Sequence, residues 1–208
     1  MQQELLPLFP LQVVLLPGAT IALHIFEERY KEMIGEAIRN RSEFGVVLAS
    51  DKGIVNTGCT AVVDRVVREY PDGRLDIIAR GRRRFEILLL NEERSFLRGA
   101  VEFFEDEPGD AAPADLLDQL VETYRELKSE DSDDDEAKAA PAPFSFQLAE
   151  LIPDLNFRQM LLATRSEAER LRRLIEYLPG FIQKLRRVRH IRTVAPTNGH
   201  ARPMARLE

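Results

Sequence analysis

The sequence from Leu5 to Gly18, LLPLFPLQVVLLPG, decides how the fold begins. It contains two short apolar runs, Leu5–Phe9 and Val13–Leu16, and the pair Pro17-Gly18 ends the second run. Short apolar runs bounded by turn residues are typical of β-strands, and a proline followed by a glycine marks a turn. We therefore predict two short strands here, followed by a turn.

Strand-like segments continue from this start to about residue 104. The valine-rich segment 60–70 and the segment 75–79 flank Pro71-Asp72-Gly73-Arg74, where proline presets φ and glycine accepts a positive φ. Several short strands joined by tight turns favour a closed or nearly closed barrel over a parallel α/β sheet. The other predicted strands span residues 20–24, 43–49, 84–90 and 96–104.

One helix is predicted to interrupt the strands, between Glu27 and Arg41. Its apolar residues recur at i, i+3, i+4, i+7 and i+8, which places them on one face of an α-helix. Charged residues occupy the opposite face, as on a solvated surface. The apolar positions are Tyr30, Met33, Ile34, Ala37 and Ile38.

The character of the sequence changes over residues 105–115, EDEPGDAAPAD, which we interpret as a domain boundary. Beyond it the apolar spacing is helical. The predicted fold class is therefore α+β: a small β pseudo-barrel domain with one inserted helix over residues 1–107, then an all-helical domain over residues 113–192. Residues 193–208 are predicted to form a disordered basic tail.

Helices of this second half are expected over residues 116–127, 145–152, 156–163 and 166–188. The acidic, then Ala/Pro-rich segment 129–143 is predicted to be a mobile loop. Ser145 is expected to cap the helix that ends before Pro153, and Ser166-Glu167-Ala168-Glu169 matches a capping box. Pro179-Gly180 should kink or restart the last helix.

Composition and charge exclude several classes of protein. The chain of 208 residues has a net charge of −6, although residues 184–208 carry seven Lys or Arg against one acid. A mostly acidic body disfavours broad binding of nucleic acid. No apolar run is long enough to span a membrane, and no basic segment precedes an apolar stretch after Met1. With a single cysteine, the expectation is a soluble cytoplasmic protein.

Metal and catalytic sites are not predicted. Cys59 and the three histidines, His24, His190 and His200, are not spaced like metal ligands. Cys59 adjoins a valine-rich strand and is interpreted as a packing residue. His24 lies beside Ile25 and Phe26, where a structural hydrogen bond is favoured over a catalytic role. Glu27 and Arg29 are expected to hold the junction between strand and helix.

The cluster Arg80, Arg82, Arg83 and Arg84 is the strongest electrostatic feature of the strand-rich half. On a regular strand, Arg80, Arg82 and Arg84 share one face and could hold carboxylates or phosphates. A solvated face paired with the acidic body is the favoured interpretation. The basic segment around Lys184 suits a helix C-terminus, with contact to nucleic acid as the alternative.

A series of short matches in a fixed order runs from about residue 5 to residue 190. The matches are Leu6–Leu11, Leu16–Gly18, Leu23–Glu27, Arg29-Tyr30, Phe44–Val47, Asp72–Arg74, Gly81, Arg84-Phe85, Arg158–Leu162 and Arg170-Leu171. Taken together, they resemble the N-terminal domain of the Lon protease family. The resemblance implies a β pseudo-barrel followed by helices, a region that in Lon proteases helps to recognise substrate polypeptides and supports assembly. Related domains also occur alone or attached to ubiquitin-ligase machinery.

The catalytic activity of Lon proteases is not expected to carry over. The sequence has no Gly-x-x-x-x-Gly-Lys-Ser/Thr motif for a nucleotide and no residues for a Ser-Lys peptidase domain after position 208. We therefore expect a non-catalytic module without cofactor or metal. It would bind unfolded or flexible polypeptide in an apolar groove at the junction of barrel and helices. A role as an adaptor to a separate protease or chaperone in protein quality control is a further hypothesis.

Candidate contact residues for a polypeptide or ligand are Tyr30, Arg80, Arg82, Arg84 and Phe157. The sequence alone does not separate groove aromatics from core aromatics. RNA binding through the arginine face and the basic tail is the alternative hypothesis, and it predicts a continuous positive patch. An enzyme with an unrecognised site is the third, and it predicts a deep pocket with a titratable residue of shifted pKa.

Overall fold

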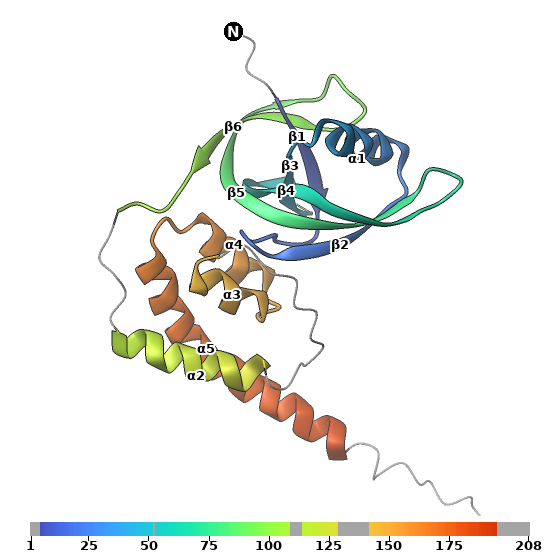
Figure 1. Cartoon of the computed structure of the whole chain (residues 1–208). Coiled ribbons are helices and arrows are strands. Elements are labelled where there is room, and N and C mark those ends of the chain that lie inside the picture. Colours follow the sequence, from blue (N-terminus) through green and yellow to red (C-terminus); the bar gives the residue numbers. More distant parts are fainter. Residues whose placement is uncertain (1–4, 52, 109–113, 129–141, 195–208) are drawn as a thin grey trace, which may run out of the picture.

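The computed structural model describes residues 5–51, 53–108, 114–128 and 142–194. Figure 1 shows a β-barrel beside a layer of helices, joined by the segment after the last strand. The strands are β1 (Leu6–Leu11), β2 (Thr20–Ile25), β3 (Phe44–Ser50), β4 (Gly53–Glu69), β5 (Leu75–Asn91) and β6 (Arg98–Phe104). The helices are α1 (Glu28–Asn40), α2 (Ala114–Lys128), α3 (Phe144–Glu150), α4 (Leu155–Ala163) and α5 (Glu167–Val194).

The strands close into a barrel, which confirms the predicted α+β fold. β1 pairs in parallel with β3, β3 pairs antiparallel with β4, and β4 pairs antiparallel with β5. β5 then pairs with β6, and β6 returns to β1, so the ring of strands is complete. β2 lies outside this ring, on the first part of β5.

Phe85 fills the inside of the barrel, where it clusters with Leu8, Val47 and Ile87. The Phe85 ring leaves room only for a glycine at the paired position of β4, which is Gly58. A Cβ built on Gly58 would lie 2.5 Å from the Phe85 ring, far closer than two carbon atoms can approach. The small barrel therefore closes around one aromatic side chain.

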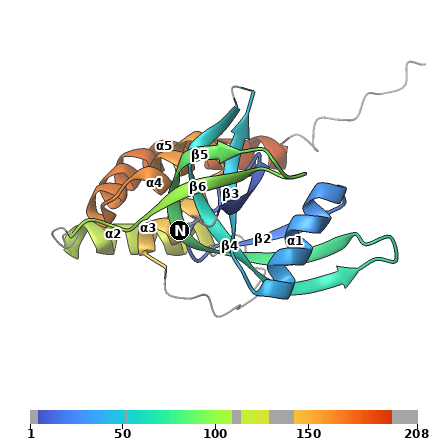
Figure 2. The ribbon, with the colours of Figure 1, turned by 90° about the horizontal axis from the view of Figure 1, so that it is seen from above.

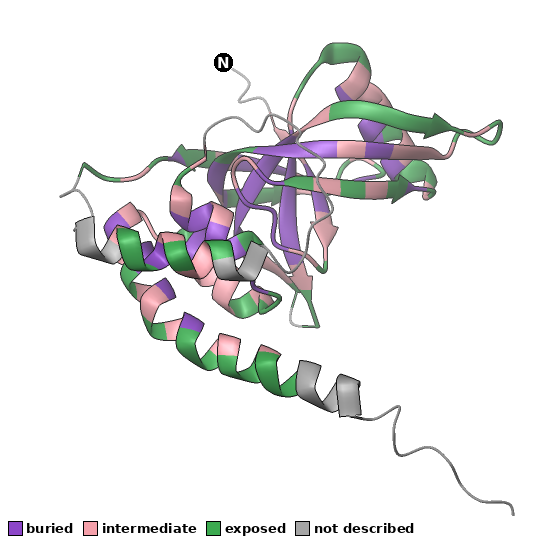
Figure 3. Ribbon diagram, turned by 60° about the horizontal axis from the view of Figure 1, so that its bottom comes forward, coloured by how far each residue is buried: buried purple, intermediate pink, exposed green. Residues whose placement is uncertain are grey.

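A second and larger cluster connects the barrel strands with α1 and with the helices of the second half. It contains Met33 of α1, Leu120 of α2, Phe146 of α3, Leu161 of α4 and Leu171 of α5. Viewed from above, α1 and the tip of the β4–β5 hairpin lie on the side of the barrel opposite the helical layer (Figure 2). Buried residues concentrate in the barrel strands and in the helices next to them (Figure 3). The two halves therefore share one continuous core.

Four local predictions differ from the structure. The two strands predicted over residues 75–79 and 84–90 form the single strand β5. Val13–Leu16 forms no strand; instead Val14, Leu15 and Leu16 are buried in the larger cluster. Ser145 does not cap α3, since Pro143 occupies the N-cap position. Pro179-Gly180 does not divide the last helix, because α5 is continuous from Glu167 to Val194.

Several predicted elements are confirmed. α1 follows the predicted apolar stripe, and four of its five positions are buried: Tyr30, Met33, Ile34 and Ala37. One half of the predicted capping box forms, because the Glu169 amide donates to Ser166 Oγ at 3.3 Å, while the Glu169 carboxylate accepts from Arg173. The predicted mobile loop 129–143 falls outside the described residues except for its last two positions. The predicted basic tail also lies outside them, apart from residues 193–194, which are helical.

Candidate functional site

The arginine run of β5 is not presented on one face, contrary to the prediction. Arg80 and Arg84 are buried, with 9% and 6% of their surface exposed, whereas Arg82 is exposed. The cause is a β-bulge: Ala61 pairs with Gly81 and Cys59 with Arg84, so Thr60 alone opposes two residues of β5. An extra residue in one strand breaks the alternation of faces. The expectation that every second residue of the strand shares a face therefore fails at this point.

Arg84 is held entirely by protein groups at the junction of the two halves. Its Nη1 donates to the carbonyl oxygens of Leu162 and Thr164, at 3.3 Å and 2.7 Å. Its Nη2 donates to Asp106 Oδ1 at 2.5 Å. Arg84 therefore joins β5 to the end of α4 and is not free to hold a ligand.

Asp106 also receives the guanidinium of Arg170, which comes from α5 and is fully buried. Nη1 and Nη2 of Arg170 lie 2.6 Å and 2.5 Å from the two carboxylate oxygens of Asp106. Nε donates to Ser145 Oγ at 2.8 Å, and Nη2 also donates to Glu167 at 2.7 Å. We refer to Arg84, Asp106, Ser145, Glu167 and Arg170 as the junction clamp.

The charges of the junction clamp stabilise one another. Burial raises the pKa of Asp106, but the hydrogen bonds and charges of Arg170 and Arg84 outweigh it and leave the pKa below its usual value. Burial lowers the pKa of Arg84. For Arg170, the bonds to Asp106 and Glu167 overcome burial and raise the pKa. The shifts of Asp106 and Arg170 favour their charged forms, whereas burial acts against the charge of Arg84, so the ion pair with Arg170 is the one that the environment supports most.

A pocket of about 470 Å³ opens beside this clamp. We call it the junction pocket. Its apolar wall is formed by Pro17, Phe103, Phe104, Pro143 and Phe146, and its polar wall by Arg82, Arg83, Arg84, Glu105 and Asp106. Phe103 is 43% exposed, so its ring offers apolar surface to this pocket. The barrel–helix junction is thus incompletely packed, as the groove hypothesis requires.

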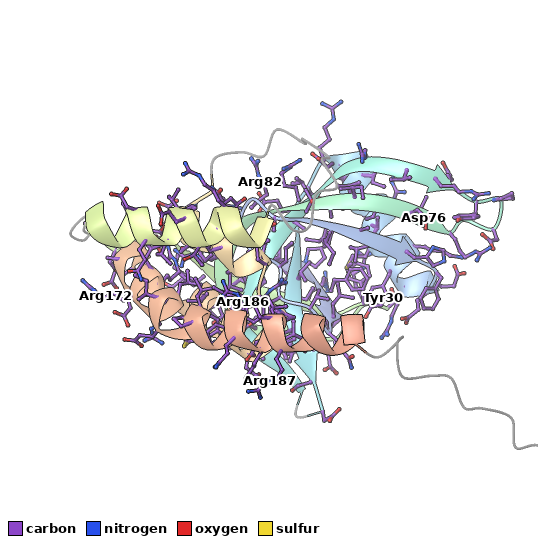
Figure 4. All side chains as sticks on the ribbon, turned by 90° about the horizontal axis from the view of Figure 1, so that it is seen from below. Tyr30, Asp76, Arg82, Arg172, Arg186 and Arg187 are labelled. Atoms are coloured by element: carbon purple, nitrogen blue, oxygen red, sulfur yellow. The ribbon has the colours of Figure 1, made fainter. Side chains whose placement is uncertain are left out.

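Arg82 is the arginine of this pocket whose guanidinium group remains available to a bound molecule. Its side chain makes no hydrogen bond or ion pair with any residue that the structure describes. Arg83 differs, since it pairs with Glu43 at 2.9 Å and stacks over the Phe103 ring. Figure 4 shows Arg82 on the barrel, close to the helical layer.

A second and larger hollow of about 1190 Å³ lies on the other side of Phe103, between α1 and strands β1 and β6. We call it the edge groove. Its arginines are already paired, Arg83 with Glu43, Arg94 with Glu36 at 2.6 Å and Arg98 with Glu93 at 3.4 Å. Arg83 and Phe103 line both hollows and separate them. The apolar residues of the groove include Leu5, Leu6, Pro7, Val101 and Phe103.

Tyr30, Arg80 and Phe157, the remaining predicted contact residues, line neither hollow. Tyr30 is buried and its ring stacks on Phe9 at 4.2 Å, and burial raises its pKa. Arg80 donates to Asp64 at 2.8 Å. Phe157 stacks on Tyr177 at 3.9 Å, on the side of α4 and α5. Of the five predicted contacts, only Arg82 and Arg84 reach the junction pocket.

The residues considered for chemistry have structural partners. His24 Nδ1 lies 2.6 Å from Asp76, which Tyr70 also contacts at 2.8 Å. The hydrogen bonds from His24 and Tyr70 lower the pKa of Asp76. Cys59 is fully buried, and burial raises the pKa of its thiol to about 12. Among the described residues, no group of His, Cys, Asp and Glu could hold a metal ion.

Sequence reasoning missed the residues that build the junction. Asp106 belongs to the acidic segment that was interpreted as a boundary, and Phe103 looks like any strand aromatic. Neither residue carries a local sequence signal, since Arg170, a partner of Asp106, lies 64 positions away in the sequence. No helix in the described part of the chain is long and apolar enough to cross a membrane.

Comparisons with known proteins all point to Lon proteases. A family model described as the ATP-dependent protease La (LON) substrate-binding domain matches residues 5–179. A Lon protease of Parabacteroides distasonis is 30% identical over 133 residues, covering 60% of this chain but only 16% of that protein. The chain therefore matches a small part of the length of this relative.

Two solved structures share the fold. The Lon N-terminal domain protein from Xanthomonas campestris aligns with a TM-score of 0.66 and 29% identity, covering 84% of this chain and 98% of that one. The N-terminal domain of a Mycobacterium avium complex Lon protease aligns with a TM-score of 0.60 and 18% identity, covering 85% and 98%. The second likeness concerns the fold alone.

Proposed function

Because the chain belongs to the family of LON substrate-binding domains, we propose that it recognises unfolded or flexible polypeptide and that the junction pocket receives an apolar side chain of the bound segment. The observation that carries this proposal is the exposed Phe103 in a pocket walled by Phe104, Phe146 and two prolines. Binding sites for apolar groups are concave, largely apolar and furnished with a few polar groups. Arg82 supplies such a polar group.

The module acts by binding and not by catalysis. Asp106 is the pocket carboxylate whose pKa is shifted, and it already accepts hydrogen bonds from Arg84 and Arg170. It therefore lacks the free proton-transfer capacity that a general acid or base needs. The matched family region is a substrate-binding domain, and the sequence contains no nucleotide-binding motif. We assign to it the role of an adaptor that presents polypeptide to a separate protease or chaperone in the cytoplasm.

RNA binding is the alternative hypothesis, and the placement of the arginines disfavours it. Arg80 and Arg84 are buried and paired, so they add nothing to a surface patch. Figure 4 shows Arg82 on the barrel and Arg186 and Arg187 on α5, so the strand arginine and the basic residues of that helix belong to different layers of the molecule. Two of the three strand arginines are therefore missing from the continuous positive surface that RNA would need.

The direct test is fluorescence anisotropy of a labelled, permanently unfolded polypeptide titrated with the protein. Labelled single-stranded RNA is titrated in parallel, and both are measured at low and high salt. We expect saturable binding of the polypeptide with little salt dependence. Binding of RNA that collapses in high salt, without binding of the polypeptide, would replace this proposal with the RNA hypothesis.

A further inference from the structure

One edge of β6 is open over most of its length. β6 pairs with β5 from Arg98 to Phe104, but with β1 only at Arg98 and Gly99. From Ala100 to Phe104, no strand among the described residues lies against the second edge. An open edge presents unpaired N–H and C=O groups, which can form hydrogen bonds with another extended chain.

The edge groove lies beside this open edge. Val101 and Phe103 are two positions apart on β6, so both side chains stand on the same face of the strand, and both line the groove. Leu5, Leu6 and Pro7 extend the apolar lining along β1. A chain added next to β6 would place every second side chain on this same face.

The charges of the groove favour a polypeptide as its occupant. Arg83, Arg94 and Arg98 each have a carboxylate partner, so the lining carries no unpaired row of cations for a phosphate backbone. What remains is main-chain hydrogen bonding and contact with apolar side chains. These are the two contributions by which strand addition recognises extended peptides.

β2 offers a useful contrast. Its outer edge also lacks a partner strand in the described part of the chain. There the exposed residues are Thr20, Ala22 and His24, which are small or polar. The open edge of β6 differs because a large exposed aromatic residue, Phe103, belongs to it.

We propose that the edge groove binds an extended polypeptide segment as an added strand beside β6, with alternate apolar side chains directed toward Val101 and Phe103. This inference rests on the proposed function. It adds the conformation of the bound segment and the kind of sequence that is bound. Because Phe103 lines both hollows, a segment paired with β6 continues toward the junction pocket. The recognised sequence alternates apolar with other residues, since only one face of the added strand meets the groove.

The test uses short fluorescein-labelled peptides of alternating valine and threonine with lysines at both ends. Two further versions carry N-methyl groups on every second residue, in one or the other register, which blocks the hydrogen bonds of one edge. We expect one methylated version to bind about tenfold more weakly, while the other binds like the parent peptide. Equal binding of all three peptides would overturn strand addition.

The outcomes separate this inference from the proposed function. If the unfolded polypeptide binds but none of the alternating peptides does, the function stands and strand addition fails. If no polypeptide of any kind binds, both fail. If the peptides bind only after residues 1–4 are removed, the occupant of the edge is the chain's own N-terminus and the inference is overturned.

Amide hydrogen exchange provides a second readout on the intact protein. Peptide binding should slow exchange of amides within Ala100–Phe104 at least severalfold, because new hydrogen bonds protect open edge amides. The outer edge of β2, residues 20–25, is the internal control and should not change. Protection at β2 in place of β6 would place the added strand elsewhere and contradict the inference.

Discussion

Asp106 and Arg170 form a two-point ion pair between the segment after β6 and the long helix α5, with N–O distances of 2.6 Å and 2.5 Å. The same carboxylate also accepts a bond from Arg84 of β5. One acidic residue therefore ties the barrel to the helical half through two arginines. Since the junction pocket lies beside this clamp, the clamp also fixes the shape of the proposed binding site.

The substitution Asp106→Asn should strongly lower the stability of the folded protein. The substitution keeps the shape of the side chain but removes the carboxylate that pairs with buried Arg84 and leaves buried Arg170 with Glu167 alone, which should lower the free energy of unfolding by about 3 kcal/mol. Urea unfolding at neutral pH measures this loss. Asp118→Asn, an exposed change on α2, serves as control and should stay within about 0.5 kcal/mol of the parent. A loss for D106N no greater than that of the control would refute the clamp.

The same pair predicts a pH dependence. The pKa of Asp106 is lower in the folded chain than in the unfolded chain, so its contribution to stability is present above the unfolded pKa of about 4 and is lost as pH falls toward the folded pKa. The stability difference between the parent and D106N should therefore shrink as pH falls from 6 to 3. Urea titrations at several pH values test this. A difference that stays constant would show that the charge of Asp106 does not act as described.

Two glycines, one in the barrel and one in α5, should respond oppositely in stability to replacement by alanine. Gly58→Ala brings a methyl group against the Phe85 ring and should destabilise the protein by about 1–3 kcal/mol. Gly180→Ala faces open space within α5 and should stabilise it by about 0.5–1 kcal/mol, because alanine has the higher helix propensity. Thermal unfolding compares both variants with the parent. A Gly58→Ala variant as stable as the parent, or more stable, would contradict the packing described around Phe85.

Cys59 should be unreactive in the folded protein. Its side chain is fully buried and its pKa is raised to about 12, so almost no thiolate is present or accessible at pH 8. A chromogenic disulfide reagent should label the thiol only after denaturant is added. Rapid labelling of the native protein would show that the strand around Cys59 opens readily.

The sequence predicted the elements whose signal is local. The α1 helix follows from the spacing of Tyr30, Met33 and Ile34, and the β4–β5 hairpin follows from the turn at Pro71–Arg74. The barrel class follows from the number of short strands and turns. These features depend on neighbours in the chain, and tertiary contacts do not override them here.

The candidate site depended on contacts that are distant in sequence, and there the predictions were incomplete. The bulge opposite Thr60 moved Arg82 away from the face of Arg84, and no alternation pattern shows a bulge. Asp106 and Arg170 are 64 positions apart, so the charge that pairs them could not be located from the acidic boundary segment. A pocket does lie at the barrel–helix junction, and of the five predicted contact residues Arg82 and Arg84 line it.

The central claim is that Phe103 forms part of a polypeptide-binding surface. The measurement that tests it most directly is the affinity of a labelled, permanently unfolded polypeptide for the parent, Phe103→Ala and Phe26→Ala. Phe26 is the matched control, since it is 58% exposed and lines neither hollow. We predict that F103A weakens binding about tenfold, as removal of a central aromatic contact does, while F26A leaves it unchanged. Equal affinities for all three proteins, each shown to be folded, would contradict the account.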